Sequence, residues 1–213
     1  MNQPVLGIIG GGQLGSMLSE AAKKIDIKTV VLSDDPDAPA KNFANKFIYG
    51  KYNDTKIITE FVNSVDLVTY EFENIPFDIL NEINKSKSVL PKPEINSLIQ
   101  NRLTEKDFLN KNNIRTTNYA LIKNKYEIKD NENLLPGLLK TTTLGYDGKG
   151  QYKLNSLIDI NEDIDFTKEY ILEKFINLKK EISIVICRFG NQKYEIYEPI
   201  ENVHEDQILK HSK

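Results

Sequence analysis

The N-terminal part of the chain carries the pattern that most restricts its fold. A short apolar run at Val5–Ile9 is typical of a buried parallel strand and leads straight into the glycine loop Gly10–Gly15. A helix-like segment follows, then a second apolar run at Thr29–Leu32 and two aspartates. Strand, glycine loop, helix, strand and acid is the order of a βαβ unit that can hold a phosphate at a helix N-terminus. The loop fits G-x-G-x-x-G, but this spacing alone does not specify NAD.

The same alternation continues to about Glu94 and predicts a compact α/β unit with four strands. Helical spacing at Thr55–Asn63 is followed by a strand-like run at Val65–Tyr70, which leads into Glu71 and Glu73. Ligands of open parallel sheets lie at the carboxyl ends of the strands, so these glutamates are placed to bind a substrate amine or hydroxyl. Capping of the next helix is the alternative, and for Glu71 the two interpretations have equal weight.

Two helices can be described further from their apolar spacing. The first is expected to bury one apolar face, made of Leu14, Met17, Leu18, Ala21, Ala22 and Ile25. The second covers Ile95–Asn112 and carries Arg102 and Lys106 four residues apart. Cations on a helix face are usually solvated, although on this helix they could also point at a phosphate.

The second half of the chain predicts an α+β arrangement. Strand-like segments LLPGLLK and QYKLN flank a glycine-rich stretch, and Tyr170–Ile176 is a further strand with Glu173 embedded in it. The polar segment Lys123–Asn133 is expected at the surface. Two more strands, EISIVICRF and KYEIYEPIENVH, are separated by a turn, and no helix follows to cover them before Lys213. Because uncovered strands do not complete a domain, we expect the sequence to be a fragment.

The glycine-rich stretch Lys140–Gln151, KTTTLGYDGKGQ, is the strongest candidate for a ligand site. Three glycines fall within six residues, and Lys140 and Lys149 accompany them. Backbone amides that side chains do not cover, together with ammonium groups, complement the oxygens of a polyphosphate. A surface hairpin turn is the alternative, because Asp-Gly is a common hairpin signal.

The composition excludes several classes of function. Charged residues make up 28% of the chain and the net charge is −3, so we expect no electrostatic preference for nucleic acid or for an anionic membrane. No apolar run reaches the ~18 residues that span a bilayer. The only cysteine, Cys187, cannot form an internal disulfide and is expected to be a small buried residue of a strand. These features fit a cytoplasmic protein.

Several segments together resemble one enzyme family. The order GIIGGGQLGSML, YEFENIP, NRLTEK, KTTTLGYDGKGQ, EKFINLKKEISIV and PIENVHEDQIL is similar to that of the N5-carboxyaminoimidazole ribonucleotide synthetases. These are ATP-grasp enzymes of purine biosynthesis, the ATPase partners of phosphoribosylaminoimidazole carboxylase. GYDGKGQ combined with EKFI and a later glutamate is specific, whereas GGGQLG alone is not. The resemblance runs through all 213 residues.

The resemblance implies three parts of the chain. Residues 1–94 would form a Rossmann-like pre-ATP-grasp domain that does not bind NAD. Residues 95–172 would supply a linker helix and the ATP-grasp lid, and residues 173–213 the start of an incomplete C-terminal lobe. ATP would lie between the lid and that lobe.

The resemblance also implies roles for single residues. In the nucleotide site, Lys140 would contact the phosphates and the loop Gly145–Gln151 would close over them. Residues Glu173–Ile176 would form a hinge that reads adenine, and Glu181 would bind the ribose. The implied nucleotide-binding residues are Arg102, Lys140, Gly145, Gly148, Gly150, Gln151, Glu173, Lys174, Phe175, Ile176, Glu181 and His204. Tyr146, Asp147 and Lys149 would be catalytic. Residues that face the ribonucleotide would be Gly12, Gln13, Leu14, Glu73 and Tyr146.

The implied reaction joins bicarbonate to 5-aminoimidazole ribonucleotide at the expense of ATP. ATP with Mg²⁺ would phosphorylate bicarbonate to carboxyphosphate, which delivers carbon dioxide to the exocyclic amine. The family's magnesium ligands would lie beyond Lys213, so no metal ligand is named and we expect little or no turnover by this chain. Leu144 stands where the family commonly has a glycine, which implies a stiffer lid loop. The family also suggests a homodimer.

Three other functions remain open from the sequence. A formate-dependent glycinamide ribonucleotide transformylase would share the lysine, the lid and the hinge. An NAD-dependent dehydrogenase would use the glycine loop Gly10–Gly15 but leaves the second half of the chain unexplained. A non-catalytic remnant would only bind nucleotide or dimerise.

Overall fold

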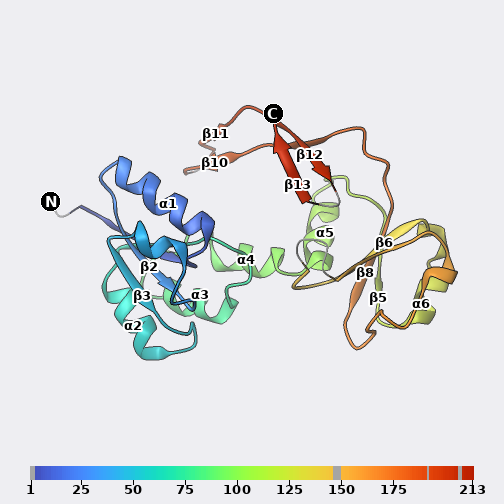
Figure 1. Cartoon of the computed structure of the whole chain (residues 1–213), viewed down its shortest axis with the longest axis horizontal. Coiled ribbons are helices and arrows are strands. Elements are labelled where there is room, and N and C mark those ends of the chain that lie inside the picture. Colours follow the sequence, from blue (N-terminus) through green and yellow to red (C-terminus); the bar gives the residue numbers. More distant parts are fainter. Residues whose placement is uncertain (1–2, 146–149, 191, 206–207) are drawn as a thin grey trace. The chain divides into compact units, whose positions relative to one another are not determined.

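The chain folds into two compact units, Met1–Glu105 and Lys106–Lys213. The computed structural model describes residues 3–145, 150–190, 192–205 and 208–213, and Figure 1 shows its helices and strands. Within these ranges no helix is both long enough and apolar enough to cross a membrane. Each unit has its own hydrophobic core.

The first unit is built on a four-stranded parallel sheet in the order β3–β2–β1–β4. Its strands are β1 (Val5–Ile9), β2 (Lys28–Ser33), β3 (Lys46–Tyr49) and β4 (Leu67–Tyr70). Its helices include α1 (Gln13–Lys24), the 3-10 helix η1 (Pro39–Asn42), α2 (Thr55–Asn63) and α3 (Phe77–Asn84). The predicted α/β alternation is therefore confirmed. Helix α2 begins where expected, because the Asp54 carboxylate accepts the N–H groups of Lys56 and Ile57.

The predicted buried face of α1 is wrong for most of its residues, although Ala22 is buried and Leu18 packs, partly buried, against the core. The buried residues of this helix are all small, namely Gly15, Ser16, Ser19 and Ala22. Leu14 and Met17 are instead 61% and 58% exposed. The reason is the close approach of the helix to the glycine loop: a Cβ on Gly15 would lie 2.7 Å from the carbonyl oxygen of Gly10. Large apolar side chains do not fit there, although their spacing on the helix was correct.

The predicted helix over Ile95–Asn112 is in fact two helices. They are α4 (Pro93–Ile99) and α5 (Arg102–Lys111). The Asn101 side chain caps the start of α5, because its Oδ1 accepts the N–H groups of Leu103 at 2.9 Å and Thr104 at 3.3 Å. Asparagine favours such capping positions over helix interiors because its short side chain competes for backbone N–H groups.

The second unit contains a four-stranded antiparallel sheet in the order β5–β8–β6–β7. Its strands are β5 (Tyr119–Ile122), β6 (Gly137–Thr141), β7 (Gln151–Leu154) and β8 (Tyr170–Lys174). Helix α6 (Lys125–Asp130) and two 3-10 helices, η2 (Glu132–Leu134) and η3 (Leu157–Asp159), accompany the sheet. The segment expected to be purely surface-exposed thus forms α6 and buries Ile128 in the core. Strands β6 and β7 flank the glycine-rich stretch, as predicted.

The last part of the chain forms short strands in two further sheets. These are β9 (Glu181–Ser183), β10 (Ile186–Arg188), β11 (Tyr194–Ile196), β12 (Ile200–Glu205) and β13 (Ile208–Ser212). Strands β10 and β11 form a hairpin, and β12 lies between β9 and β13. Cys187 on β10 is exposed, so the expectation that it is buried is wrong. Its strand pairs with β11, and none of its three residues is buried.

Candidate functional site

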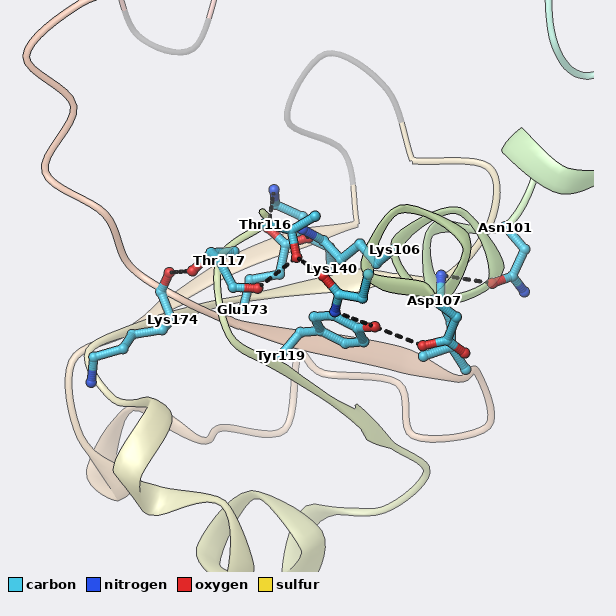
Figure 2. A network of polar contacts seen from close by, with 11 residues as sticks. Asn101, Lys106, Asp107, Thr116, Thr117, Tyr119, Lys140, Glu173 and Lys174 are labelled. Carbon is cyan, nitrogen blue, oxygen red and sulfur yellow. Dashed lines mark hydrogen bonds and ion pairs between the residues drawn. The ribbon is translucent and has the colours of Figure 1, made fainter. Parts of the chain in front are cut away.

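A buried carboxylate between two lysines is the main feature of the second unit. Glu173 on β8 is 7% exposed. Its Oε2 lies 2.8 Å from the Nζ of Lys140 on β6, and its Oε1 lies 3.2 Å from the Nζ of Lys106 on α5 (Figure 2). The strand register explains the contact between Glu173 and Lys140. Leu138 pairs directly with Glu173, so Lys140, two residues further along β6, is the diagonal neighbour of Glu173 on the same face of the sheet.

The two ammonium groups keep this carboxylate ionised. Burial by itself would raise the pKa of Glu173, but the hydrogen bond and charge of Lys140, and then those of Lys106, hold that pKa below its ordinary value of 4.5. One carboxylate and two ammonium groups leave a net charge of +1 in a largely desolvated place. Such an excess suits an anionic ligand.

Lys106 is the residue of this cluster whose role the sequence left undecided. Its Nζ lies 5.6 Å from the centroid of the Tyr119 ring. The Tyr119 hydroxyl donates to Oδ1 of Asp107 at 2.6 Å and accepts from Nδ2 of Asn110 at 3.1 Å. These contacts fasten α5 to β5. The sequence feature that could have pointed to Lys106 is Glu173 itself, because a carboxylate inside an apolar strand requires cationic partners.

A pocket of about 680 Å³ opens beside the cluster. Besides Lys140 and Glu173 it is lined by Arg115, Thr116, Thr117, Leu138, Lys174, Phe175, Ile176, Asn177 and Leu178. An apolar lining with a few polar groups is typical of small-molecule sites, and the volume fits a nucleotide. The predicted hinge Glu173–Ile176 therefore lines the pocket together with Lys140.

Hydrogen bonds hold the hinge in place. The Thr117 hydroxyl donates to the carbonyl of Lys174 at 2.7 Å. The N–H of Lys174 donates to the carbonyl of Asn118 at 2.8 Å, and that of Phe175 to the carbonyl of Pro136 at 2.9 Å. The hinge backbone is thus fixed from both neighbouring segments, which is what recognition of a flat base by main-chain groups requires.

The glycine-rich stretch is anchored at both ends to strands. Gly150 has φ of +68°, and a Cβ there would lie 2.9 Å from Oγ1 of Thr141. Leu144 also has a positive φ, +58°, which a leucine rarely adopts. Gln151 pairs in register with Lys140. Gly145 is described, whereas Tyr146, Asp147, Gly148 and Lys149 lie outside the described residues.

Two further predicted residues come together on another sheet of the second unit. Nδ1 of His204 on β12 lies 3.5 Å from Oε1 of Glu181 on β9. Their strands are neighbours, and Asn202, which pairs in register with Glu181, also reaches that carboxylate through Nδ2 at 3.4 Å. The sequence had named both residues for the nucleotide without predicting their contact.

The glycine loop of the first unit is occupied by the chain's own carboxylate. Glu71 accepts the N–H of Gly12 at 2.6 Å through Oε1 and the N–H of Gly15 at 2.7 Å through Oε2. It therefore caps the start of α1, and not the start of the next helix. The amides that would hold a dinucleotide phosphate are already hydrogen-bonded, which argues against the dehydrogenase alternative.

The remaining predicted residues also belong to the first unit. Gln13 and Leu14 are exposed at the start of α1. Glu73 is exposed as well, and its carbonyl accepts Nε2 of Gln100 at 2.6 Å. Arg102 is the first residue of α5.

The family models match the two units separately. Residues 3–100 match the ribonucleotide synthetase preATP-grasp domain, and residues 107–213 match the ATP-grasp domain. This chain belongs to the ATP-grasp family. The predicted Rossmann-like pre-ATP-grasp domain followed by ATP-grasp elements is thereby confirmed. The match boundaries agree with the division at Glu105, while the finer boundaries at residues 94 and 172 stay predictions.

The relatives are consistent in name. The chain is 37% identical to the N5-carboxyaminoimidazole ribonucleotide synthase of Brucella melitensis, over 96% of this chain and 58% of that protein. A crystal structure of the Staphylococcus aureus synthetase complexed with ADP superposes with a TM-score of 0.91 at 36% identity, covering 97% of this chain and 56% of that one. The Aspergillus clavatus synthase in complex with ADP and 5-aminoimidazole ribonucleotide gives 0.86 at 27% identity, covering 98% and 56%.

Glu173, Lys140 and the pocket lie within the residues that match the ATP-grasp domain, and Lys106 directly precedes them. The chain spans about 56–58% of the length of these relatives. Among the described residues, no group of three or more His, Cys, Asp or Glu side chains could hold a metal ion. No magnesium ligand is therefore assigned.

Proposed function

We propose that this chain supplies the nucleotide-binding part of an N5-carboxyaminoimidazole ribonucleotide synthetase. The reaction is the ATP-dependent carboxylation of 5-aminoimidazole ribonucleotide by bicarbonate. One observation carries the proposal: the Glu173–Lys140–Lys106 cluster lies at a pocket whose other wall is the predicted hinge. Relatives bearing this name, and structures of such synthetases in complex with ADP or with ADP and the ribonucleotide, support it.

The residues of the second unit divide the work on ATP. Lys140 neutralises phosphate charge, and the hinge Glu173–Ile176 holds the base, largely through its backbone groups. Glu181 and His204 act on the ribose side of the nucleotide. The loop Gly145–Gln151 closes over the phosphates and keeps water from a labile intermediate, a function that glycine-hinged lids commonly have.

The chemistry consists of two transfers. The γ-phosphoryl group of ATP passes to an oxygen of bicarbonate, which gives ADP and carboxyphosphate. The carboxyl carbon then joins the exocyclic amine of the ribonucleotide, phosphate leaves and the amine loses a proton. Mg²⁺ would neutralise the phosphate charge in the first transfer. Tyr146, Asp147 and Lys149 are the proposed catalytic residues, and Gly12 to Leu14 together with Glu73 are proposed to face the ribonucleotide.

The setting of the protein is also part of this proposal. We expect it in the cytoplasm, where purine precursors are made, and as a homodimer. Light scattering of the purified chain would test the second point.

The decisive experiment measures ADP binding and ADP formation with the same protein preparations. Calorimetry should show ADP binding to the unmodified chain and a loss of at least about tenfold in affinity in Lys140→Met, because one charge-assisted contact to phosphate is removed. Lys125→Met, an exposed lysine on α6, is the matched control and should bind normally. Absence of ADP binding to the unmodified chain would overturn the proposal.

The turnover assay then separates the related functions. ADP formation with ATP, magnesium and bicarbonate that requires 5-aminoimidazole ribonucleotide supports the synthetase. Formation that requires formate and glycinamide ribonucleotide supports the transformylase instead. Binding of ADP without turnover is what we expect of this chain by itself, and the same assay on a chain extended by a homologous C-terminal segment then decides between the synthetase and a nucleotide-binding role alone.

A further inference from the structure

We propose that Lys106 is a positioning residue that keeps Glu173 paired while Lys140 binds phosphate. This inference rests on the proposed nucleotide site and assigns a role to a lysine outside the predicted set of site residues. Lys140 has two competing partners, the Glu173 carboxylate and the polyphosphate of a bound nucleotide. Lys106 makes the exchange between them possible.

The geometry gives each lysine its own oxygen of Glu173. Lys140 bonds to Oε2 at 2.8 Å and lines the pocket. Lys106 bonds to Oε1 at 3.2 Å from α5 and is absent from the residues that line the pocket. The two side chains are 24% and 16% exposed. Lys140 can therefore reach a ligand in the pocket, while Lys106 remains paired with Glu173.

The contacts of Lys106 keep it on the carboxylate side. Its ammonium lies by the Tyr119 ring, whose hydroxyl is tied to Asp107 and Asn110 of the same helix (Figure 2). A buried carboxylate without a counter-ion is strongly unfavourable. If Lys140 alone paired with Glu173, every move of Lys140 to a phosphate would leave such a carboxylate behind. With Lys106 in place, Glu173 keeps one partner throughout.

The charge count also favours a polyanion. Two ammonium groups and one carboxylate give a net +1 before binding. Lys140 can thus turn to a phosphate without a proton having to be taken up or released by Glu173. Glu173 therefore keeps Lys106 as its ion-pair partner before and after Lys140 turns to the phosphate.

The test is a double-mutant cycle between Lys106 and Glu173 with ADP as the probe. Calorimetry on the full chain would compare Lys106→Met, Lys106→Arg, Glu173→Gln and the double variant Lys106→Met/Glu173→Gln. We expect Lys106→Met to weaken ADP binding at least about tenfold and Lys106→Arg to restore it to within about threefold. Lys111→Met, an exposed lysine on the same helix, is the control and should bind like the unmodified chain.

The double variant separates positioning from other roles. In the Glu173→Gln background no carboxylate needs a partner, so the further change Lys106→Met should alter the Kd by less than about twofold. A loss as large as in the single variant would show direct phosphate binding or a purely structural role and overturn the inference. If Lys106→Met alone does not fold, the arginine and double variants still decide the question.

The outcome also separates this inference from the proposed function. If the unmodified chain does not bind ADP, both fail. If the unmodified chain binds ADP and Lys106→Met binds it equally well, the nucleotide site stands and only the role of Lys106 is overturned.

Discussion

At the scale of single residues, Glu173 connects the fold to the site. Its position on β8 places it inside the sheet, where only ion pairing makes a carboxylate acceptable. The ion pair with Glu173 also holds the Lys140 side chain where it lines the pocket. One residue therefore stabilises the second unit and organises its candidate ligand site.

The stability of the chain should depend on the protonation of Glu173. Because its folded-state pKa is below the ordinary 4.5, its contribution is complete above that value and is lost as pH falls through the lower folded-state pKa. Urea unfolding between about pH 5 and pH 3 should show a shallower loss of stability in Glu173→Gln than in the unmodified chain. At pH 7 the substitution itself should cost about 2–3 kcal/mol, allowing for the partial exposure of the lysines.

The control for this experiment is Glu169→Gln. Glu169 forms an exposed ion pair with Lys123, and such pairs contribute little. Its variant should follow the unmodified chain at every pH. Parallel pH profiles for Glu173→Gln and the unmodified chain would contradict the assigned role of the buried carboxylate.

Leu144 is strained in the folded state. Its φ of +58° costs an L-residue roughly 1–2 kcal/mol, and its side chain is 72% exposed, so it recovers little by burial. Leu144→Gly should raise the free energy of unfolding by about 0.5–1 kcal/mol, since glycine removes the strain but adds unfolded-state entropy. Thr143→Gly is the control: the neighbouring Thr143 does not have a positive φ, so this substitution should lower the free energy of unfolding. A loss in both variants would mean that the strain is not released.

At the scale of elements, the break between α4 and α5 places Lys106. Helix α4 ends before Asn101 and helix α5 begins after it. Helix α5 is then joined to β5 by the hydrogen bond from the Tyr119 hydroxyl to Asp107. The Asn101 side chain therefore caps the start of the helix that carries Lys106.

Removal of this cap should be measurable. Asn101→Ala should destabilise the chain by about 1 kcal/mol, because two N–H groups at the start of α5 lose their acceptor. Asn101→Asp keeps an acceptor and places a negative charge at a helix N-terminus, so it should retain the stability. Chemical denaturation checks both variants, and equal stability of the alanine variant would contradict the capping role.

At the scale of the whole molecule, the two units each hold a glycine-rich loop that resembles a phosphate site. In the first unit the loop amides of Gly12 and Gly15 bond to Glu71. In the second unit the glycine-rich stretch is flanked by Lys140 and the hinge pocket. The two loops look alike in sequence, but the first has two amides bonded to a carboxylate of the chain, whereas the second is flanked by Lys140, which lines a pocket.

This difference predicts which nucleotide stabilises the protein. ADP at about 100 times its Kd should add about 2.7 kcal/mol to the free energy of unfolding, and a tenfold loss of affinity in Lys140→Met should leave about 1.4 kcal/mol of this gain at the same concentration. NAD⁺ at the same concentration should add clearly less, because the first loop offers it no free amides at Gly12 and Gly15. Thermal unfolding measures both. NAD⁺ stabilisation that equals that of ADP and persists in Lys140→Met would identify the first loop as a dinucleotide site.

The sequence by itself determined the family and most of the strands and helices, although it merged α4 with α5 and missed α6. Periodicity and glycine placement are local properties, so the parallel first unit and the hairpin around the glycine-rich stretch could be predicted from them. The motif order was specific enough to name the ATP-grasp fold, whereas the roles of Lys140 and the hinge, which line one pocket, stay predictions.

Only the tertiary structure decided which partners the charged residues take. Glu71 caps α1, Glu173 holds Lys106 as well as Lys140, and Glu181 meets His204. Each of these contacts joins residues far apart in the chain, and no local pattern encodes it. The same holds for the buried face of α1, where the close approach of one backbone to another selects small residues over apolar ones.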